Sequence, residues 1–372
     1  MSATDPYRDP GMVRALAAAI AREAQPGRVY RLMEFCGGHT HAIARHGLTD
    51  LLPPGVRLVH GPGCPACVLP PQRVDQAIAL TRIPGLILCA YGDTLRLPGV
   101  RGDSLHKARA RGGDVRPVYA APEAVACARR HPDRAVVFFA IGFETTAPAT
   151  AVALLQAREA GLENFSVYCN HVLTPPAMAA VLAGDAAVDG VIGPGHVAAI
   201  TGPGAFTPVA RDLGRPVVVC GFEPVDLLQG ILQLLRQLHA GRREVENAYA
   251  RVVAAHGNPR ARALMDRVFC LRPRSTWRGL GELPASALGI APAFRDLDAE
   301  QRHPIPETPP APDPGVGACE CGAILRGRKA PRDCRLFGRA CTPDTPLGAC
   351  MVSPEGACAA AFVYGGRRPR GR

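Results

Sequence analysis

Three cysteines in two glycine-rich turns are the residues of this sequence best suited to bind a metal. Cys36 opens the run CGGHTH, and Cys64 and Cys67 form the C-x-x-C pair of the run GPGCPAC. Thiolates bind soft and borderline metals such as iron, zinc or copper. A C-x-x-C pair can also form a disulfide, so a thiol oxidoreductase stays open, as does an ordinary structural role. Each turn precedes a predicted helix, whose N-terminal dipole should lower the thiol pKa.

Other polar side chains with chemical potential lie in similar turns. His39 and His41 follow Cys36 closely and could ligate a metal, orient a thiolate or carry protons. Glu144, Thr145 and Thr146 belong to the run GFETT. The two threonines also fit a helix cap, whereas a carboxylate beside an apolar run must find a partner. A single loop histidine, such as the one in the run GPGH, is more often a surface or capping residue.

Six more cysteines lie within 40 residues near the C-terminus: Cys319, Cys321, Cys334, Cys341, Cys350 and Cys358. They stand among Gly, Pro and turn residues with little apolar material, so something other than hydrophobic burial should hold this segment. A [4Fe–4S] cluster needs four thiolates, which would leave two cysteines for a redox pair. Zinc sites favour closer C-x₂₋₄-C pairs, and a compartment with reduced thiols disfavours disulfides, but both remain alternatives.

The remaining cysteines are expected to act as small hydrophobic residues: Cys89, Cys127, Cys169, Cys220 and Cys270.

Alternating strand and helix patterns dominate the middle of the chain. Apolar β-branched runs predict strands at 28–35, 56–60, 85–90, 115–120, 135–141, 164–169, 188–192 and 216–220. Helical stretches are predicted at 12–24, 71–82, 104–111, 122–131, 147–160, 175–183, 224–239 and 243–270. This alternation predicts parallel sheets covered by helices. The polar motifs each follow a strand directly, so they should gather at the carboxyl ends of the strands, where α/β proteins bind ligands.

The predicted fold class is therefore α/β. We expect two similar parallel-sheet α/β domains facing a central cleft, plus a small C-terminal Cys-rich iron–sulfur region. The expected divisions are a first α/β domain at 1–134 with CGGHTH and GPGCPAC, a second at 135–270 with GFETT and GPGH, a linker and Cys-rich [4Fe–4S] region at 271–364, and a disordered basic tail at 365–372.

Composition excludes some classes of protein. Hydrophobic residues make up 47% of the 372 residues, which is incompatible with wholesale disorder. The net charge of +11 owes four charges to the last six residues, and no basic stripe with interleaved aromatic residues suggests nucleic-acid binding. No apolar run is long enough to span a membrane, and no signal peptide is visible. We therefore expect a cytoplasmic protein, where 14 cysteines indicate metal or redox chemistry.

Taken together, the motifs resemble those of the hydrogenase maturation factor HypD family over nearly the whole chain. The matching runs are EFCGGHTHAI (34–43), HGPGCPAC (60–67), AIGFETTAP (140–148), IGPGHV (192–197), CGFEP (220–224), WRGLG (277–281) and CTPDTPLGACMVSPEGACAA (341–360). One small departure is Ala66, where many relatives have Val.

This resemblance implies a scaffold for assembling a metal centre rather than a conventional turnover enzyme. It implies a complex with a small HypC-type chaperone, in which iron receives cyanide from a HypE-type donor and also a carbonyl ligand. The Fe(CN)₂CO unit then passes to the large subunit of a [NiFe]-hydrogenase. Cys36, Cys64 and Cys67 match the family's essential cysteines and would hold the iron, while His39, His41 and Glu144 match motif residues of the same cleft.

The C-terminal segment of the family resembles ferredoxin:thioredoxin reductase, in which a cluster lies beside a disulfide. We assign the cluster ligands to Cys319, Cys334, Cys341 and Cys358, and the redox pair to Cys321 and Cys350. Two other functions remain open: a cluster-dependent thiol–disulfide reductase that uses the C-x-x-C pair, and a zinc-stabilised binding protein without redox activity.

Overall fold

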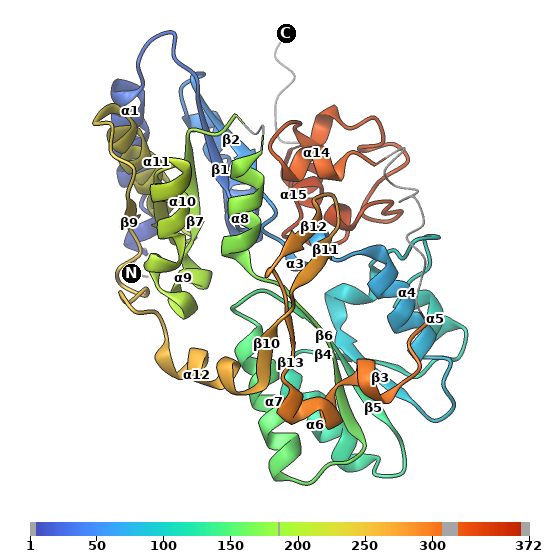
Figure 1. Cartoon of the computed structure of the whole chain (residues 1–372). Coiled ribbons are helices and arrows are strands. Elements are labelled where there is room, and N and C mark those ends of the chain that lie inside the picture. Colours follow the sequence, from blue (N-terminus) through green and yellow to red (C-terminus); the bar gives the residue numbers. More distant parts are fainter. Residues whose placement is uncertain (1–4, 185–186, 307–318, 366–372) are drawn as a thin grey trace.

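Two parallel β-sheets, each covered by helices on both faces, form the body of the protein (Figure 1). The computed structural model describes residues 5–184, 187–306 and 319–365. The first sheet has the strand order β2-β1-β7-β8-β9 and the second the order β4-β3-β5-β6, with every neighbouring pair parallel. The α/β class is therefore confirmed.

The described strands are β1 (Tyr30–Glu34), β2 (Val56–His60), β3 (Ile87–Tyr91), β4 (Val115–Val118), β5 (Val136–Gly142), β6 (Phe165–His171), β7 (Gly190–Pro194), β8 (Val217–Cys220), β9 (Val245–Asn247), β10 (Phe269–Leu271), β11 (Arg274–Trp277), β12 (Gly281–Pro284) and β13 (Leu288–Ile290). All eight predicted strands are present, with ends shifted by a few residues. β5 and β6 are buried along their whole length, as is typical of strands covered on both faces.

The described α-helices are α1 (Pro10–Glu23), α2 (Gly37–Arg45), α3 (Pro65–Val68), α4 (Pro71–Leu80), α5 (Leu105–Ala110), α6 (Ala121–Arg130), α7 (Ala147–Glu159), α8 (Thr174–Ala183), α9 (Gly195–Thr201), α10 (Thr207–Leu213), α11 (Pro224–His239), α12 (Pro259–Val268), α13 (Ala299–Arg302), α14 (Cys321–Leu325) and α15 (Ala357–Tyr364). None of the helices in the described ranges is both long enough and apolar enough to cross a bilayer.

The strands do not divide between the sheets at residue 134, as the sequence analysis expected. β1 and β2 start the first sheet, the chain then builds the whole second sheet from β3 to β6, and it returns to the first sheet with β7. β7 pairs directly with β1. The boundary near 134 is wrong for the sheets because β5, which follows it, pairs with β3, which precedes it.

The segment 243–270 is only partly helical. β9 adds a strand to the edge of the first sheet, and α12 begins only at Pro259. Asn258 caps this helix, because its side chain accepts a hydrogen bond from the backbone N–H of Ala261 at 3.0 Å. The prediction of one long helix is wrong because Gly257, Asn258 and Pro259 interrupt its Ala- and Arg-rich pattern.

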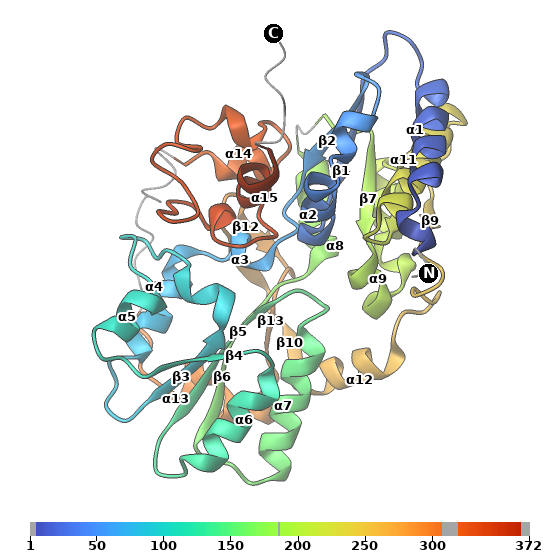
Figure 2. The same ribbon diagram turned by 180° about the vertical axis from the view of Figure 1, so that it is seen from behind.

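The C-terminal region packs against the two short helices that follow β1 and β2. Helix α15 contacts α2, and the 3₁₀ turn Ala349–Met351 contacts α3 (Figure 2). Before it, the antiparallel hairpin of β11 and β12 carries the buried Trp277. Most of the predicted proline-rich linker (307–318) and of the basic tail (366–372) lies outside the described residues.

Candidate functional site

The first two strands deliver their cysteines to the same place. Cys36 immediately precedes α2, and Cys64 immediately precedes α3. The amide of Gly37 donates a hydrogen bond to the carbonyl of Gly63 at 2.8 Å, which ties the two turns together. A Cβ atom on Gly63 would lie only 2.2 Å from the backbone nitrogen of Cys36, so the turns are in direct contact. This contact explains why a residue without a side chain precedes Cys64.

Replacing Gly63 by alanine should therefore disturb the turn that carries Cys36. We expect Gly63→Ala to lower the free energy of unfolding by about 3 kcal/mol, because backbone atoms cannot move aside for the new methyl group. Gly92→Ala is a matched control, since no heavy atom lies within 4 Å of its added Cβ, and should change stability by no more than about 0.5 kcal/mol. Guanidinium denaturation of both variants measures the difference, and equal stabilities would contradict this account of the turn.

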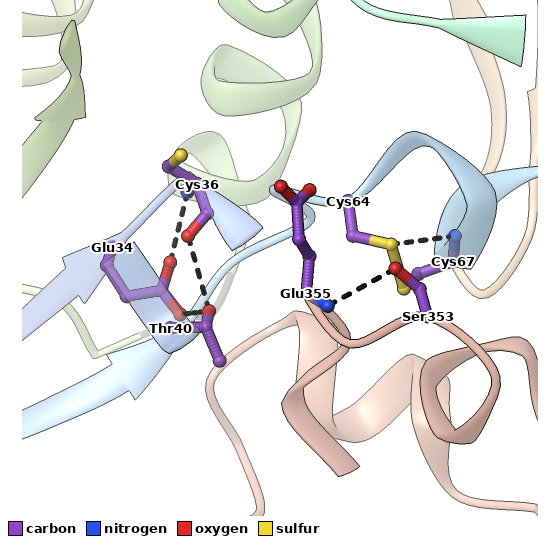
Figure 3. Close-up of a disulfide and its surroundings, with 7 residues drawn as sticks. All are labelled: Glu34, Cys36, Thr40, Cys64, Cys67, Ser353 and Glu355. Atoms are coloured by element: carbon purple, nitrogen blue, oxygen red, sulfur yellow. Dashed lines mark hydrogen bonds between the residues drawn. A yellow bond between two sulfur atoms is a disulfide. The ribbon is translucent and has the colours of Figure 1, made fainter. Parts of the chain in front are cut away.

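Cys64 and Cys67 are joined by a disulfide, with their Cα atoms 5.2 Å apart (Figure 3). The Sγ atom of Cys64 also accepts a hydrogen bond from the backbone N–H of Cys67 at 3.2 Å. In this state neither sulfur is a thiolate. Of the three cysteines that the sequence analysis assigned to iron, Cys36 alone is a free thiol.

The thiol of Cys36 lies against the ring of His196, with its sulfur 3.5 Å from Nε2. That ring in turn stacks on Phe222, with centroids 5.1 Å apart and an angle of 9° between planes. Burial lowers the pKa of His196 to about 4, so the imidazole is neutral at pH 7. The histidine beside Cys36 therefore comes from the GPGH run, which the sequence analysis had judged weak.

Cys36 is a protonated thiol in this environment, contrary to the expected effect of the helix dipole. Burial raises its pKa well above the ordinary value, and the charges of Glu355 and Glu34 raise it further. Backbone N–H groups of α2 lower it, but by less than burial raises it. Figure 3 shows Glu355, from the C-terminal region, beside the two turns. A cation at this point would lower the pKa of Cys36, because it favours the thiolate and neutralises the carboxylates.

Glu34 organises the base of the site. Its carboxylate is buried and accepts hydrogen bonds from the backbone N–H of Cys36 at 3.0 Å, from the hydroxyl of Thr40 and from Nδ1 of His60 at 2.7 Å. It thus links the ends of β1 and β2 to the first turn of α2. The sequence signal for this role is the one acidic residue of β1, at the strand's carboxyl end.

His39 and His41 do not lie against the Cys36 sulfur. His39 is buried, with Nε2 3.3 Å from the carbonyl of Cys220, and burial lowers its pKa to about 3. His41 faces the C-terminal region, where its ring nitrogens lie 3.4 Å from the carbonyl of Pro354 and 3.3 Å from the hydroxyl of Tyr364. These positions suit packing around the site rather than direct contact with the Cys36 thiol.

Glu144 finds its partner at the start of α8. Its carboxylate accepts hydrogen bonds from the backbone N–H of Thr174 at 2.7 Å and from the Thr174 hydroxyl at 2.9 Å. Thr146 is the residue before α7 but makes no capping bond with its side chain, and Thr145 is exposed. Burial raises the pKa of Glu144 to about 7.

This raised pKa gives a measurable pH dependence of stability. The folded protein holds the Glu144 proton up to about pH 7, whereas the unfolded chain releases it near 4.5, so ionising Glu144 makes folding less favourable as pH rises between these values. In the wild-type protein this ionisation should lower the free energy of unfolding by about 3 kcal/mol between pH 4.5 and 8. We expect Glu144→Gln to abolish this decrease. Urea denaturation of both proteins across this range isolates the effect. Parallel pH profiles would contradict it.

All six C-terminal cysteines line one small cavity, which leaves only about 10 Å³ of room for a water molecule. Apolar side chains from the same segment complete its wall, among them Ile324 and Phe337. The neighbouring thiols of Cys319 and Cys350, followed by the charge of Arg278, lower the pKa of Cys321. Burial and the neighbouring thiols raise the pKa of Cys358.

No three His, Cys, Asp or Glu side chains in residues 5–184, 187–306 and 319–365 are arranged so that they could hold a metal ion as they stand. Metal binding in the C-terminal cavity therefore requires the thiols to turn toward a common point. At the strand ends it also requires reduction of the Cys64–Cys67 disulfide.

A single buried core joins the two groups of cysteines. It contains Cys64 and Cys67 together with Cys321, Cys334, Cys341, Cys350 and Cys358, and Cys319 packs against it. Arg278 lies between the groups, because its backbone N–H donates to the carbonyl of Val68 in α3 at 2.7 Å while the charge of its guanidinium lowers the pKa of Cys321. The sequence analysis had noted Arg278 only as part of the WRGLG run.

Known proteins resemble this chain over nearly its whole length. A family model for HypD, described as "Hydrogenase formation hypA family", matches residues 11–365. The hydrogenase maturation factor HypD of Azotobacter vinelandii is 57% identical to this chain, with 99% of this chain and 98% of the relative covered. The HypD proteins of Rhizobium leguminosarum bv. viciae and Escherichia coli K12 are 53% and 43% identical, covering 100% and 98% of this chain and 98% of each relative. The chain therefore belongs to the HypD family of hydrogenase maturation factors.

Proposed function

We propose that this protein is a cytoplasmic scaffold on which the Fe(CN)₂CO unit of a [NiFe]-hydrogenase is assembled. A HypC-type chaperone shares the complex, and a HypE-type protein donates cyanide. The iron is cargo, held between the two sheets by Cys36 and by the reduced thiols of Cys64 and Cys67. The finished unit then passes toward the hydrogenase large subunit.

The surroundings of Cys36 support a cationic cargo. A buried thiol flanked by the carboxylates of Glu34 and Glu355 is unfavourable as a lone anion. A ferrous ion supplies the missing positive charge and favours the thiolate. His196 is neutral and within 3.5 Å of the sulfur, so it can accept the thiol proton as the metal binds.

The redox part of the proposal rests on the buried core that the C-x-x-C pair shares with the C-terminal cysteines. Opening the Cys64–Cys67 disulfide takes two electrons and two protons and yields two thiols. Six thiols around one cavity exceed the four that a [4Fe–4S] cluster needs, so the donor set fits. Such a cluster supplies electrons one at a time.

We assign this cluster to Cys319, Cys334, Cys341 and Cys358, and the redox pair beside it to Cys321 and Cys350. The thiol of Cys321 lies close to that of Cys350, its proposed partner, and also close to that of Cys319. The pair shares one buried core with Cys64 and Cys67, and Arg278 bonds α3 beside that core, which supports electron transfer from the pair to the strand-end disulfide.

A second candidate function is a cluster-dependent thiol–disulfide reductase, which the disulfide form of the C-x-x-C pair favours. In this case Cys64 and Cys67 would reduce a disulfide substrate without any partner. Turnover of such a substrate by the isolated chain, with no bound iron at the strand ends, would favour this function over the scaffold.

Metal analysis of anaerobically purified protein tests the proposal against its alternatives. The scaffold predicts four irons with sulfide, plus further iron when the C-x-x-C pair is reduced and the partner is present. A zinc-stabilised binding protein predicts one or two zincs and no sulfide, and that result would overturn the proposal.

A further inference from the structure

Two cysteines that the sequence analysis treated as packing residues meet inside the second sheet's core. Cys89 lies on β3, and Cys127 lies on α6, the helix that covers one face of that sheet. Both are buried, with relative exposures of 0% and 3%. Cys89 lies opposite Arg116 of β4 in the sheet, and the Arg116 guanidinium contacts Cys127, so the two thiols are close enough for each to shift the pKa of the other. Neither belongs to the motifs shared with the HypD family, and both lie in a different core from the C-x-x-C pair.

Arg116 on β4 places a positive charge against this cysteine pair. Its Nη1 donates to the Sγ atom of Cys127 at 3.7 Å. The same guanidinium is fixed by two bonds to Asp114, at 2.9 and 3.0 Å, and lies 2.7 Å from Nε2 of His131. A cationic group is therefore held against one sulfur of the pair, while the other sulfur is fully enclosed.

The other buried strand cysteines differ from this pair. Cys169 and Cys220 donate to backbone carbonyls, at 3.3 Å each, and burial raises the pKa of both thiols. In contrast, the neighbouring Cys89 thiol and the charge of Arg116 lower the pKa of Cys127. A thiolate is the reactive form of cysteine, so Cys127 is set apart from its buried counterparts.

We propose that Cys89 and Cys127 form an oxidisable dithiol, separate from the metal-handling cysteines, that hydrogen peroxide converts to a disulfide. In the first step the Cys127 thiolate attacks peroxide and takes one oxygen, giving a sulfenic acid and, with one proton, water. In the second step the Cys89 thiol displaces that hydroxyl as water, and the sulfur–sulfur bond forms. Two electrons pass from the sulfurs to peroxide in total.

The geometry supports peroxide access from one side. The side chains of Arg116 and Asp114 are 33% and 30% exposed, and Arg116 contacts the nearly buried Cys127, so we infer that a small oxidant approaches Cys127 from this side. The resulting bond would fasten α6 covalently to β3, in the centre of the second sheet. The dithiol would thus respond to oxidants without consuming the cysteines of the proposed iron site.

Peptide mapping of the full chain tests this directly. Trypsin places Cys89 alone in peptide 83–96, Cys127 alone in peptide 112–129 and Cys169 alone in peptide 159–211. After a brief peroxide pulse, catalase and alkylation in denaturant, we expect the 83–96 and 112–129 peptides to be linked. The Cys169 peptide should remain singly alkylated. Loss of Cys89 and Cys127 as free thiols no faster than Cys169, or oxidation of Cys127 without linkage to Cys89, would overturn the proposal.

Two arginine variants test the role of the guanidinium. Arg116→Gln should slow formation of the linked peptide about tenfold at pH 7, because the thiolate fraction of Cys127 falls. Arg134→Gln is the matched control, since Arg134 also binds Asp114, at 2.8 Å, and should leave the rate unchanged. Thermal unfolding of both variants checks that the fold is kept. Equal rates for the two variants would overturn the role given to Arg116.

Discussion

Cys64→Ala is expected to abolish hydrogenase maturation while leaving the C-terminal cluster in place. The substitution removes one proposed iron ligand and one half of the disulfide, but Cys64 is absent from the cavity that the six C-terminal cysteines line. Loss of a metal-binding thiol should reduce maturation by more than about 100-fold, since comparable losses follow even from changes one shell further out. Hydrogenase activity in a complemented deletion strain measures the loss of maturation. Cluster absorbance of the purified variant measures whether the C-terminal cluster is kept.

Cys169→Ala is the matched control for this prediction. Cys169 is as buried as Cys64 and lies in strand β6 of the other sheet, but its thiol donates to the carbonyl of Leu288. This variant loses similar packing and should still mature the hydrogenase. Full maturation by Cys64→Ala would show that iron is not held at the strand ends.

Cys341→Ala is expected to lose the brown colour and the visible absorbance of the iron–sulfur cluster. Cys341 lines the C-terminal cavity and is one of the four ligands proposed here. A cluster with three thiolates loses iron readily, so we expect iron and sulfide content to fall at least about tenfold. Electron supply to the Cys64–Cys67 disulfide would stop as well, so maturation should also fail.

Cys350→Ala separates the cluster from its redox pair. Under the proposed assignment this variant keeps its cluster absorbance but no longer passes electrons to the strand-end disulfide. Both variants alter the same cavity, so the comparison controls for disturbed packing. Unchanged absorbance in Cys341→Ala would exclude Cys341 as a cluster ligand. Loss of the cluster in Cys350→Ala would show that Cys350 is a cluster ligand and not part of the redox pair.

Much of the fold could be predicted because its signals are local. The run VVFFAIG of β5 is apolar and β-branched at successive positions, and such a run forms a strand covered on both faces. The placement of motifs after strands also follows from local pattern, and it correctly located the turns at Cys36 and Cys64. Pairing partners carry no such signal, which is why the insertion of β7 beside β1 was not foreseen.

The contacts that determine the chemistry of Cys36 could not be predicted for the same reason. His196 lies 160 residues away in the sequence, and Glu355 comes from the C-terminal region. The helix dipole is a local feature and suggested a low thiol pKa. Burial by distant segments outweighs it, and burial cannot be read from the turn itself.

The cysteine cluster at the C-terminus was visible from its density, but its connection to the strand ends was not. Arg278 links α3 to the C-terminal cysteines, because its backbone N–H bonds Val68 and its charge lowers the pKa of Cys321. No feature of the WRGLG run reveals such a bridge. The core shared by the C-x-x-C pair and the C-terminal cysteines arises only when the hairpin and α3 pack together.

Infrared spectroscopy of the anaerobic complex with the HypC-type partner tests the central claim most directly. Cyanide and carbonyl ligands on iron absorb where protein does not, so the wild-type complex should show their stretching bands. The same complex with Cys64→Ala should lack them while keeping its cluster. A wild-type complex that matures hydrogenase yet shows no such bands, or a Cys64→Ala complex that retains them, would contradict the account.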